Sequence, residues 1–518
     1  MIRAGIKPLT MWWCVFAAFT VISLWPIWSE RFPPMQDYPE HLARARMLCT
    51  PQDSALDFHQ NFDIHLRPLY ASFFLVTIFF SKFVGLECAG KLAISLYVVL
   101  VMTLVLVQAR RSRLEVPPWG LLLFFPLAFN QQYYLGFVNF CYSVPLLLLT
   151  LLDQQDLASA PLGRWRIGKQ CLLQAVLFIT HPFTFLIYLA LATVAATFRW
   201  RDRTRAKRMA VSPLIGLVLL FAWLVVAKRI GLLSGVSSQS AFGWKPLSET
   251  IGFYCCMFTG MRWHDGVDSN IAVVWMIALA CLIFACFTDD EPTHRFPHHV
   301  VAFFVLTTLA MLALPFFVND SESTVHYTFF NFRISSISYF MLGWLVGTVR
   351  FRGPCAALFV GCLLVILLAS AGKQMEISRG IQEIAPIIEK IPPNERILPL
   401  VFNRRTPELD PVYFQVHLHA PEYYHALVGG GVTPYFFPDP LHPATLRPGA
   451  APPAPNEDMP FLFRWDQHGS GYRYFLTRDA PMDFVWYLSE TTELKARSGK
   501  WLLFERKPEA ATNRNTAR

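Results

Sequence analysis

Residues 9–28 read LTMWWCVFAAFTVISLWPIW, an apolar run that polar loop residues follow at once. A helix of about 20 apolar residues crosses the hydrocarbon core of a bilayer, and tryptophans near its end suit the membrane interface. The run is too long for a signal-peptide core and lacks a small-x-small cleavage pattern. We therefore expect a membrane helix that stays attached as a signal anchor.

The composition predicts many such helices. Hydrophobic residues make up 54% of the 518 residues and charged residues 16%, and apolar runs recur as far as Ser370. The net charge of +9 comes from basic residues in short loops between these runs, where they set membrane orientation. A basic face for nucleic acid is therefore not expected, and the chain is predicted to be a polytopic membrane protein.

The apolar runs predict a mainly α-helical transmembrane bundle of about eleven spans over residues 1–372. The run at 169–198 is interrupted by His181-Pro182, since proline removes a helix hydrogen bond. The expected spans are 9–28, 69–86, 91–109, 118–130, 135–152, 169–198, 209–231, 271–287, 298–318, 333–349 and 353–371.

The basic loops predict the orientation of these spans. With Arg3 and Lys7 in the cytoplasm, eleven crossings place residues 199–208 and 350–352 there too, as the positive-inside rule requires. The first loop, 30–68, and the C-terminal part then lie outside. Residues 110–113, Arg-Arg-Ser-Arg, also fall outside in this scheme, against the rule.

Residues 373–518 predict a small extracytoplasmic α/β domain. Alternating and β-branched segments predict strands, and two segments have helical character. The proline-rich segment 434–460 predicts a long loop or flap. The expected strands are 396–402, 412–417, 473–477 and 501–505, and the expected helices are 381–390 and 422–428.

The first loop carries the motif Gln36-Asp-Tyr-Pro-Glu-His41. Pro39 is placed to open a helix, on which Glu40, His41 and Arg44 can share a face. Asp37 at the positive end of this helix could accept a proton or hold a divalent cation, while Arg44 could meet a phosphate. Alternatively, Asp37 is an ordinary helix cap without chemistry.

The Asp-x-Pro-x-His-Leu element at 37–42, the segment 133–140 (YYLGFVNF) and Thr180-His-Pro182 together resemble polytopic bacterial proteins of the GT-C glycosyltransferase superfamily. The resemblance covers residues 9–372. It implies many membrane helices, an acidic residue in a large first outer loop and a C-terminal periplasmic domain in the bacterial inner membrane. It also implies transfer of a sugar from a polyprenyl-phosphate carrier to an envelope glycan, lipid or protein, with inversion.

By position, the resemblance implies that Asp37 is the general base or a ligand of Mg²⁺ or Mn²⁺. Glu40 and His41 are further catalytic candidates. The sequence lacks the acidic doublet of better-characterised members at the start of the loop, and it has no clear second Asp-x-Asp. Candidates for substrate binding are Tyr38, Arg44, Tyr134, Asn139, His181 and Arg333.

Several of these candidates have structural alternatives. Ionisable groups at membrane depth are costly unless they are paired or face a cavity, so His181 and Arg333 are functional candidates, with Arg333 on the carrier phosphate. Alternatively, Arg333 extends to the interface and His181 makes a hydrogen bond at a helix kink. Tyr134 and Asn139 could simply pack between helices.

A second polar group lies in the C-terminal part. On the predicted strand, His417 and His419 share a face, with Glu422 and His425 close behind on a helix. The group is similar to a zinc site, but its spacing matches no established ligand pattern. The alternative is that these histidines lie on the surface.

Two other functions remain open from the sequence. A transporter or flippase of lipid-linked glycans predicts inverted repeats and paired broken helices, whereas the sequence shows one clear break and no repeat. A non-catalytic envelope assembly protein would use its outer domain to bind a partner.

Overall fold

The computed structural model describes residues 8–50, 55–66, 68–112, 117–159, 161–229, 240–259, 266–288, 297–320, 326–328, 330–405, 415–436 and 442–508. The chain forms two compact units. Unit 1 comprises residues 1–25, 94–133 and 137–372, and unit 2 comprises residues 26–93, 134–136 and 373–518.

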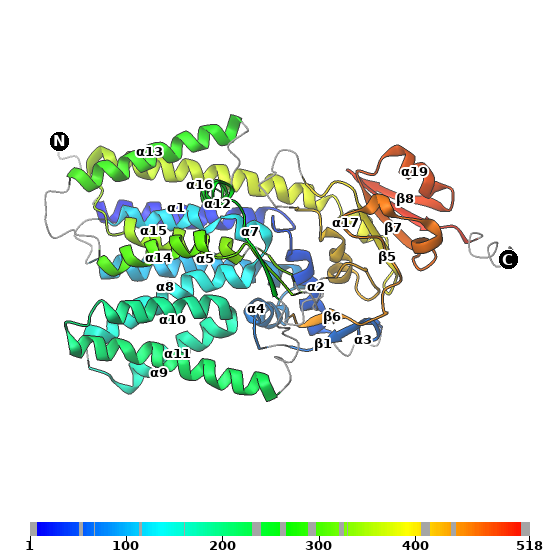
Figure 1. The fold of residues 1–518 in the computed structure, drawn as a ribbon. Coiled ribbons are helices and arrows are strands. Elements are labelled where there is room, and N and C mark those ends of the chain that lie inside the picture. The colour runs from blue at the N-terminus through cyan, green and yellow to red at the C-terminus, as the bar shows by residue number, and fades with distance from the viewer. Residues whose placement is uncertain are drawn as a thin grey trace. The chain divides into compact units, whose positions relative to one another are not determined.

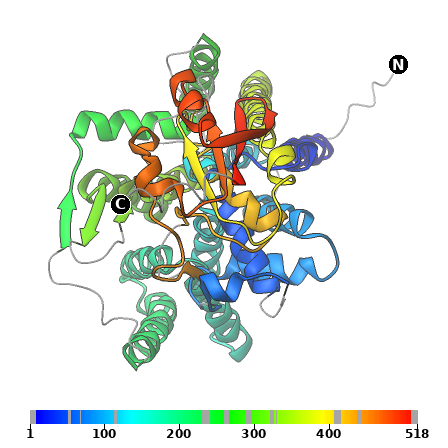
Figure 2. The same ribbon diagram turned by 90° about the vertical axis from the view of Figure 1, so that its right-hand side faces the viewer.

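Unit 1 is a bundle of helices that run alongside one another, with a three-stranded antiparallel sheet in the order β2-β3-β4 (Figure 1). Figure 2 views helices such as α9, α10 and α11 nearly end-on. The elements that lie wholly or partly in unit 1 are α1 (Pro8–Ser29), α5 (Leu86–Arg111), η1 (Trp119–Leu123), α6 (Phe124–Ala128), α7 (Gln131–Leu135), α8 (Val138–Ser159), α9 (Arg164–Thr180), α10 (Pro182–Thr197), α11 (Arg203–Arg229), β2 (Ser240–Gly243), α12 (Leu247–Thr259), α13 (Gly266–Thr288), α14 (His298–Ala313), β3 (Phe317–Asp320), β4 (His326–Thr328), α15 (Phe330–Val346) and α16 (Gly353–Gln382).

The predicted helical class is confirmed, and the chain is a multi-pass membrane protein. Among the described residues, five helices are long and apolar enough to cross a membrane: Leu9–Ser29, Leu86–Arg111, Arg203–Val226, Asn270–Phe287 and a helical stretch from Gly353 to Ile388.

Two of the predicted spans are wrong in detail, and a third, 118–130, forms the two short helices η1 and α6. In place of 69–86 the structure has α4 (Ser72–Ser81), and ten residues rise only about 15 Å, half the apolar thickness of a bilayer. Ser81 and Lys82 end this helix, and the chain turns before α5 begins at Leu86.

The second correction concerns 169–198, which forms the two helices α9 and α10. Pro182 opens α10, and the His181 side chain accepts a hydrogen bond from the Thr184 N–H as its N-cap. Gln170 on α9 donates to the Tyr188 hydroxyl on α10 at 2.7 Å, and the Phe178 and Phe185 rings pack at 5.1 Å. The interrupted run is therefore an antiparallel helical hairpin.

These corrections change the side expected for residues 110–113. If α4 does not cross, α1 and α5 are consecutive crossings, and Arg110 and Arg111 are expected on the side where α1 begins. If the segment at 118–130 crosses, dividing 169–198 restores the parity, and residues 199–208 are expected on the same side as before. Arg113 and the N-terminal Arg3 and Lys7 lie outside the described residues.

Unit 2 contains a four-stranded sheet in the order β5-β7-β9-β8, in which β5 and β7 are parallel and the other pairs antiparallel. The short strands β1 and β6 pair separately, Phe62 opposite Leu446. The elements of unit 2 are α2 (Tyr38–Cys49), α3 (Phe58–Asn61), β1 (Phe62–Ile64), α4, α17 (Ala385–Ile388), β5 (Ile397–Val401), η3 (Ala420–Glu422), α18 (Tyr423–Leu427), β6 (Ala444–Leu446), η4 (Pro460–Leu462), η5 (Trp465–Gly469), β7 (Tyr474–Arg478), α19 (Met482–Ser489), β8 (Thr492–Ser498) and β9 (Trp501–Arg506).

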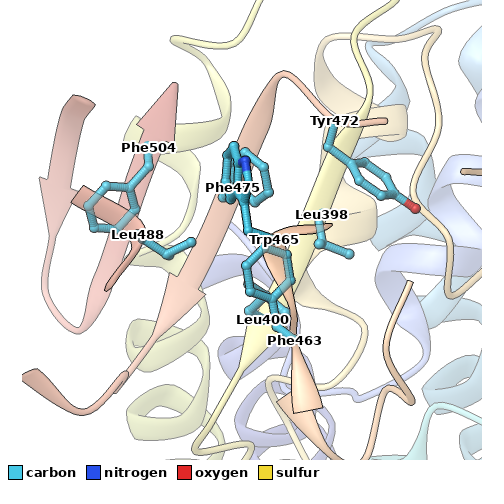
Figure 3. Close-up of a cluster of buried hydrophobic side chains, with 8 residues drawn as sticks. All are labelled: Leu398, Leu400, Phe463, Trp465, Tyr472, Phe475, Leu488 and Phe504. Carbon is cyan, nitrogen blue, oxygen red and sulfur yellow. The ribbon is translucent and has the colours of Figure 1, made fainter. Parts of the chain in front are cut away.

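The core of this sheet explains why its strands form. Every side chain of β5 and β7 is buried, including Thr477 and Arg478 of β7, so neither strand has the alternation of a half-exposed one. Figure 3 shows the aromatic and aliphatic cluster that covers them. Its buried members are Leu398, Leu400, Phe463, Trp465, Tyr472, Phe475, Leu488 and Phe504.

The predicted strands at 396–402, 473–477 and 501–505 are confirmed, whereas β8 and α19 were not predicted. The predicted strand at 412–417 is wrong where the structure describes it, since residues 415–419 form turns. Their N–H groups bond outside any ladder: Gln415 N–H to the Gln36 side chain, and His417 N–H to the Arg404 carbonyl.

The corrected topology gives a prediction about Ser112, which follows α5. A single cysteine at Ser112, introduced into a variant without its native cysteines, should be labelled by a membrane-impermeant maleimide from the same side as a cysteine at Asp202. Labelling of the two positions from opposite sides would contradict an even number of crossings between them, which the division of 169–198 into α9 and α10 provides.

Candidate active site

Two distant parts of unit 2, residues 134–135 and Gln415, hold the first-loop motif. The Gln36 N–H donates to the Tyr134 carbonyl at 2.9 Å, and the Asp37 N–H donates to the Leu135 carbonyl at 3.2 Å. The Gln36 side-chain oxygen accepts a 2.7 Å hydrogen bond from the Gln415 N–H. The backbone on both sides of the acid is therefore fixed by residues that are remote in sequence.

Gly136 allows this close approach. Its φ is +85°, a conformation that glycine adopts without strain. A Cβ atom at this position would lie 2.9 Å from the Asp37 nitrogen and 3.1 Å from the Asp37 Cβ. Any side chain here would push the loop away.

Asp37 stands at the N-cap position of α2, but its side chain makes no capping hydrogen bond to the helix. The cap alternative is therefore wrong. Its Oδ1 instead accepts a 3.0 Å hydrogen bond from Nδ1 of His419 and a weaker one, 3.3 Å, from the Gln36 amide. The side chain of Asp37 is 19% exposed and that of His419 10%.

His419 carries a positive charge in this position. Burial alone would lower its pKa, but the carboxylates of Glu40, Asp37 and Glu457 outweigh burial and raise the pKa to about 10. At neutral pH the contact therefore joins an imidazolium to a carboxylate.

The second oxygen of the Asp37 carboxylate, Oδ2, is available to accept a proton. Both side-chain hydrogen bonds end on Oδ1, and the described residues place no donor on Oδ2. A carboxylate that is oriented through one oxygen and partly exposed has the geometry that a general base needs.

His41 lies beside this acid in a different state. Its Nε2 contacts the Gly136 carbonyl at 3.1 Å, so Nε2 carries the hydrogen. Burial, with the charge of Arg44, lowers its pKa to about 4. The neutral ring fastens α2 to the 134–136 segment, which favours a positioning role over proton transfer.

Glu40 and Arg44 form an ion pair of 2.9 Å that is almost fully buried. Arg44 also donates to the Ala444 carbonyl at 3.3 Å and lies 4.5 Å from the centre of the Phe436 ring. With no exposed surface, Arg44 is not placed to meet a phosphate. Tyr38 is also buried and packs against Phe73.

A buried hydrogen-bonded chain follows His419 in the sequence. The Thr433 hydroxyl lies 2.8 Å from both carboxyl oxygens of Glu422 and 3.0 Å from Nε2 of His425, whose Nδ1 contacts the Gly430 carbonyl. If His425 Nδ1 donates to Gly430, Nε2 accepts from Thr433, and Glu422 must then supply a proton to Thr433.

The pKa shifts agree with this proton arrangement. Burial lowers the pKa of His425 to about 4. Burial, reinforced by the charge of Glu40, raises the pKa of Glu422 to about 8. Burial likewise raises the pKa of Glu457 to about 7, and both carboxyl groups line one small cavity with Leu418 and Tyr435.

The three histidines of the predicted zinc group are buried, so a surface location is wrong for them. They also have separate surroundings, because His419 binds Asp37, His425 binds Thr433, and His417 packs against Trp501. Among the described residues, no three His, Cys, Asp or Glu side chains are arranged to hold a metal ion. The expected role of Asp37 as a ligand of Mg²⁺ or Mn²⁺ stays a prediction, and its Oδ1 accepts a hydrogen bond from the cationic His419.

The remaining candidates lie near the N-terminal end of α8 or contact residues there. Tyr134 belongs to unit 2, where its carbonyl holds Gln36. In unit 1, His181 packs on Phe140 with ring centres 5.1 Å apart, and the Arg333 guanidinium lies 4.8 Å from the Phe137 ring. Asn139 is buried on the same turn. The His181 side chain accepts a hydrogen bond from the Thr184 N–H of its own helix, α10.

The residue that sequence reasoning did not connect to Asp37 is His419. The two are 382 positions apart, and no periodicity or spacing relates them. The Pro421 and Glu422 that follow His419 predict a helix start, but they do not indicate what the imidazole faces.

Comparison with known proteins shows the fold. The crystal structure of ArnT from Cupriavidus metallidurans bound to undecaprenyl phosphate matches with a TM-score of 0.50 and 14% identity, over 97% of this chain and 99% of that one. No protein-family model matches the chain, and no curated protein matches it either. At this identity the likeness is one of fold.

The proton on Glu422 gives a testable pH dependence. Between about pH 4.5 and 8 the folded protein keeps a proton that the unfolded chain releases, so Glu422 makes stability fall as the pH rises through this window. Glu422→Gln keeps a donor for Thr433 and removes the titration. Between pH 6 and 9, the melting temperature of Glu422→Gln should therefore fall by a few degrees less than that of the wild type.

The matched control is Glu490→Gln, an exposed carboxyl, which should follow the wild-type curve. Parallel melting curves for wild type and Glu422→Gln across this pH range would contradict a protonated Glu422.

Proposed function

We propose that this chain, which has the fold of GT-C membrane glycosyltransferases, transfers a sugar from a polyprenyl-phosphate donor to an acceptor hydroxyl. The observation that carries the proposal is the Asp37 carboxylate, held through Oδ1 by the charged His419 and open at Oδ2. The fold supports a lipid-linked donor, since the matching ArnT structure contains undecaprenyl phosphate.

The proposed reaction is a single displacement. Asp37 Oδ2 accepts the proton of the acceptor hydroxyl while the acceptor oxygen attacks the anomeric carbon. The bond between that carbon and the phosphate oxygen breaks, and its electron pair leaves with the polyprenyl phosphate. Attack from the side opposite the leaving group inverts the anomeric centre.

His419 acts in this scheme as a positioning residue. Its imidazolium holds the Asp37 side chain through Oδ1, because a charge-assisted hydrogen bond is short and directional. The neutral His41 and the buried Glu40–Arg44 pair hold α2 behind the acid. No step is assigned to a divalent cation.

Other parts of the proposal rest on chemistry and orientation. Arg333 is the candidate in unit 1 for the donor phosphate, because a guanidinium binds phosphate oxygens strongly. The positive-inside rule supports a cytoplasmic N-terminus and a periplasmic unit 2, so the acceptor would be an envelope glycan, lipid or protein.

Replacing Asp37 tests the proposal. Purified protein is given synthetic undecaprenyl-phosphate monosaccharides, with envelope extract as acceptor, and released undecaprenyl phosphate is measured by mass spectrometry. Asp37→Asn should lower the release rate by about 10² to 10⁴, the usual contribution of a general base. Binding of undecaprenyl phosphate should be unchanged.

Asp63→Asn is the matched control, since Asp63 is in the same loop with a side chain 57% exposed, and it should retain full activity. An Asp37→Asn enzyme as fast as the wild type would refute the base role. It would favour the non-catalytic assembly protein, whereas transbilayer movement of the lipid without its cleavage would favour a flippase.

His419 makes a second prediction for the same assay. His419→Gln should lower the rate about 10-fold to 100-fold, the worth of a hydrogen bond to a charged group. A His419→Gln enzyme as fast as the wild type would show that His419 serves packing only.

A further inference from the structure

A second hollow lies in unit 1, among the ends of several helices. It encloses about 1240 Å³, including space open to solvent. The last turn of α5, the C-terminal half of α8 and the turn after α15 form its walls. None of the residues in the Asp37 site contributes to it.

Several side chains that line this cavity are hydrogen-bond donors. Gln108 is only 7% exposed, and its side-chain nitrogen has no hydrogen-bond partner among the described residues. A buried donor without an acceptor is costly, so an acceptor atom from a ligand would relieve it.

Two arginines, Arg111 and Arg350, line the cavity together with Gln108. Arg111 uses Nη2 for the Leu152 carbonyl and for Asp156, which leaves Nε and Nη1 without a hydrogen-bond partner among the described residues. These donors therefore match an anion with several oxygen acceptors.

The lining also includes apolar side chains. Leu121, Leu152 and Trp344 line the cavity, and all three are buried in the protein. The cavity lies at the last residue of α5, a helix long and apolar enough to cross a membrane. Tryptophan and arginine at such a position are typical of the boundary between lipid and water.

We propose that this cavity binds the phosphate headgroup of an anionic phospholipid from the cytoplasmic leaflet. Phosphate oxygens accept from Gln108, Arg111 and Arg350, and the glycerol and upper acyl carbons contact Leu121 and Trp344. The corrected topology places Arg111 on the side where α1 begins, which the positive-inside rule assigns to the cytoplasm. The proposal does not depend on sugar transfer.

A lipid fits this cavity better than a free anion. Inorganic phosphate would contact the donor side chains but leave the apolar side chains of the lining uncovered. An anionic lipid would contact both kinds of side chain. The cytoplasmic leaflet also holds anionic lipids at high local concentration.

The test is a thermal-shift titration of the full-length protein in detergent. Dioleoyl phosphatidylglycerol, dioleoyl phosphatidylcholine and inorganic phosphate are added separately. Phosphatidylglycerol alone should raise the melting temperature of the wild type, because a ligand that binds only the folded state stabilises it. The double variant Gln108→Ala/Arg350→Gln should need at least about tenfold more phosphatidylglycerol to reach half of its maximal shift in melting temperature.

Arg352→Gln is the matched control, an exposed arginine two residues beyond the cavity, and it should titrate like the wild type. If the double variant does not fold, Arg350→Gln alone replaces it with the same expected direction. Equal shifts with phosphatidylcholine, or the same titration in wild type and variant, would overturn the proposal. A full shift with inorganic phosphate would overturn its lipid part.

Discussion

The contact between Asp37 and His419 is the interaction on which the organisation of unit 2 depends. It joins the loop that follows the first helix to a turn in the C-terminal region. Around it, the pairs Gln36–Gln415 and β1–β6 bring the same two regions together. The first loop and the C-terminal region are therefore parts of one compact unit, although more than three hundred residues separate them in sequence.

Burial and charge give this unit its chemistry. Four carboxyl groups and several histidines are crowded into little space, and each has a different state. Glu40 is neutralised by Arg44, Glu422 keeps its proton beside Thr433, and His419 takes a charge because carboxylates surround it. Only Asp37 combines a charged partner with an open oxygen. This difference in surroundings, rather than residue type, singles it out.

The sequence predicted the local features well. Apolar runs placed most helices, short strand-like segments between turn residues placed β5, β7 and β9, and the position of Asp37 after the first helix marked it as a candidate acid. Prediction failed where tertiary contacts decide. Residues 412–417 have strand propensity, yet Gln415 and His417, which the structure describes, bond through their backbone to Gln36 and Arg404 instead. Arg44 was expected on a phosphate, but its proximity to Glu40 and Phe436 buries it. Nothing local could relate His419 to Asp37.

A double-mutant cycle tests this account most directly. Unfolding free energies would be compared for the wild type, Asp37→Asn, His419→Gln and the variant that carries both substitutions. If the imidazolium and the carboxylate touch, the two losses should not add, and the coupling should be about 0.5–3 kcal/mol. Strict additivity would mean that the two side chains do not meet, and the proposed arrangement of the acid would then be wrong.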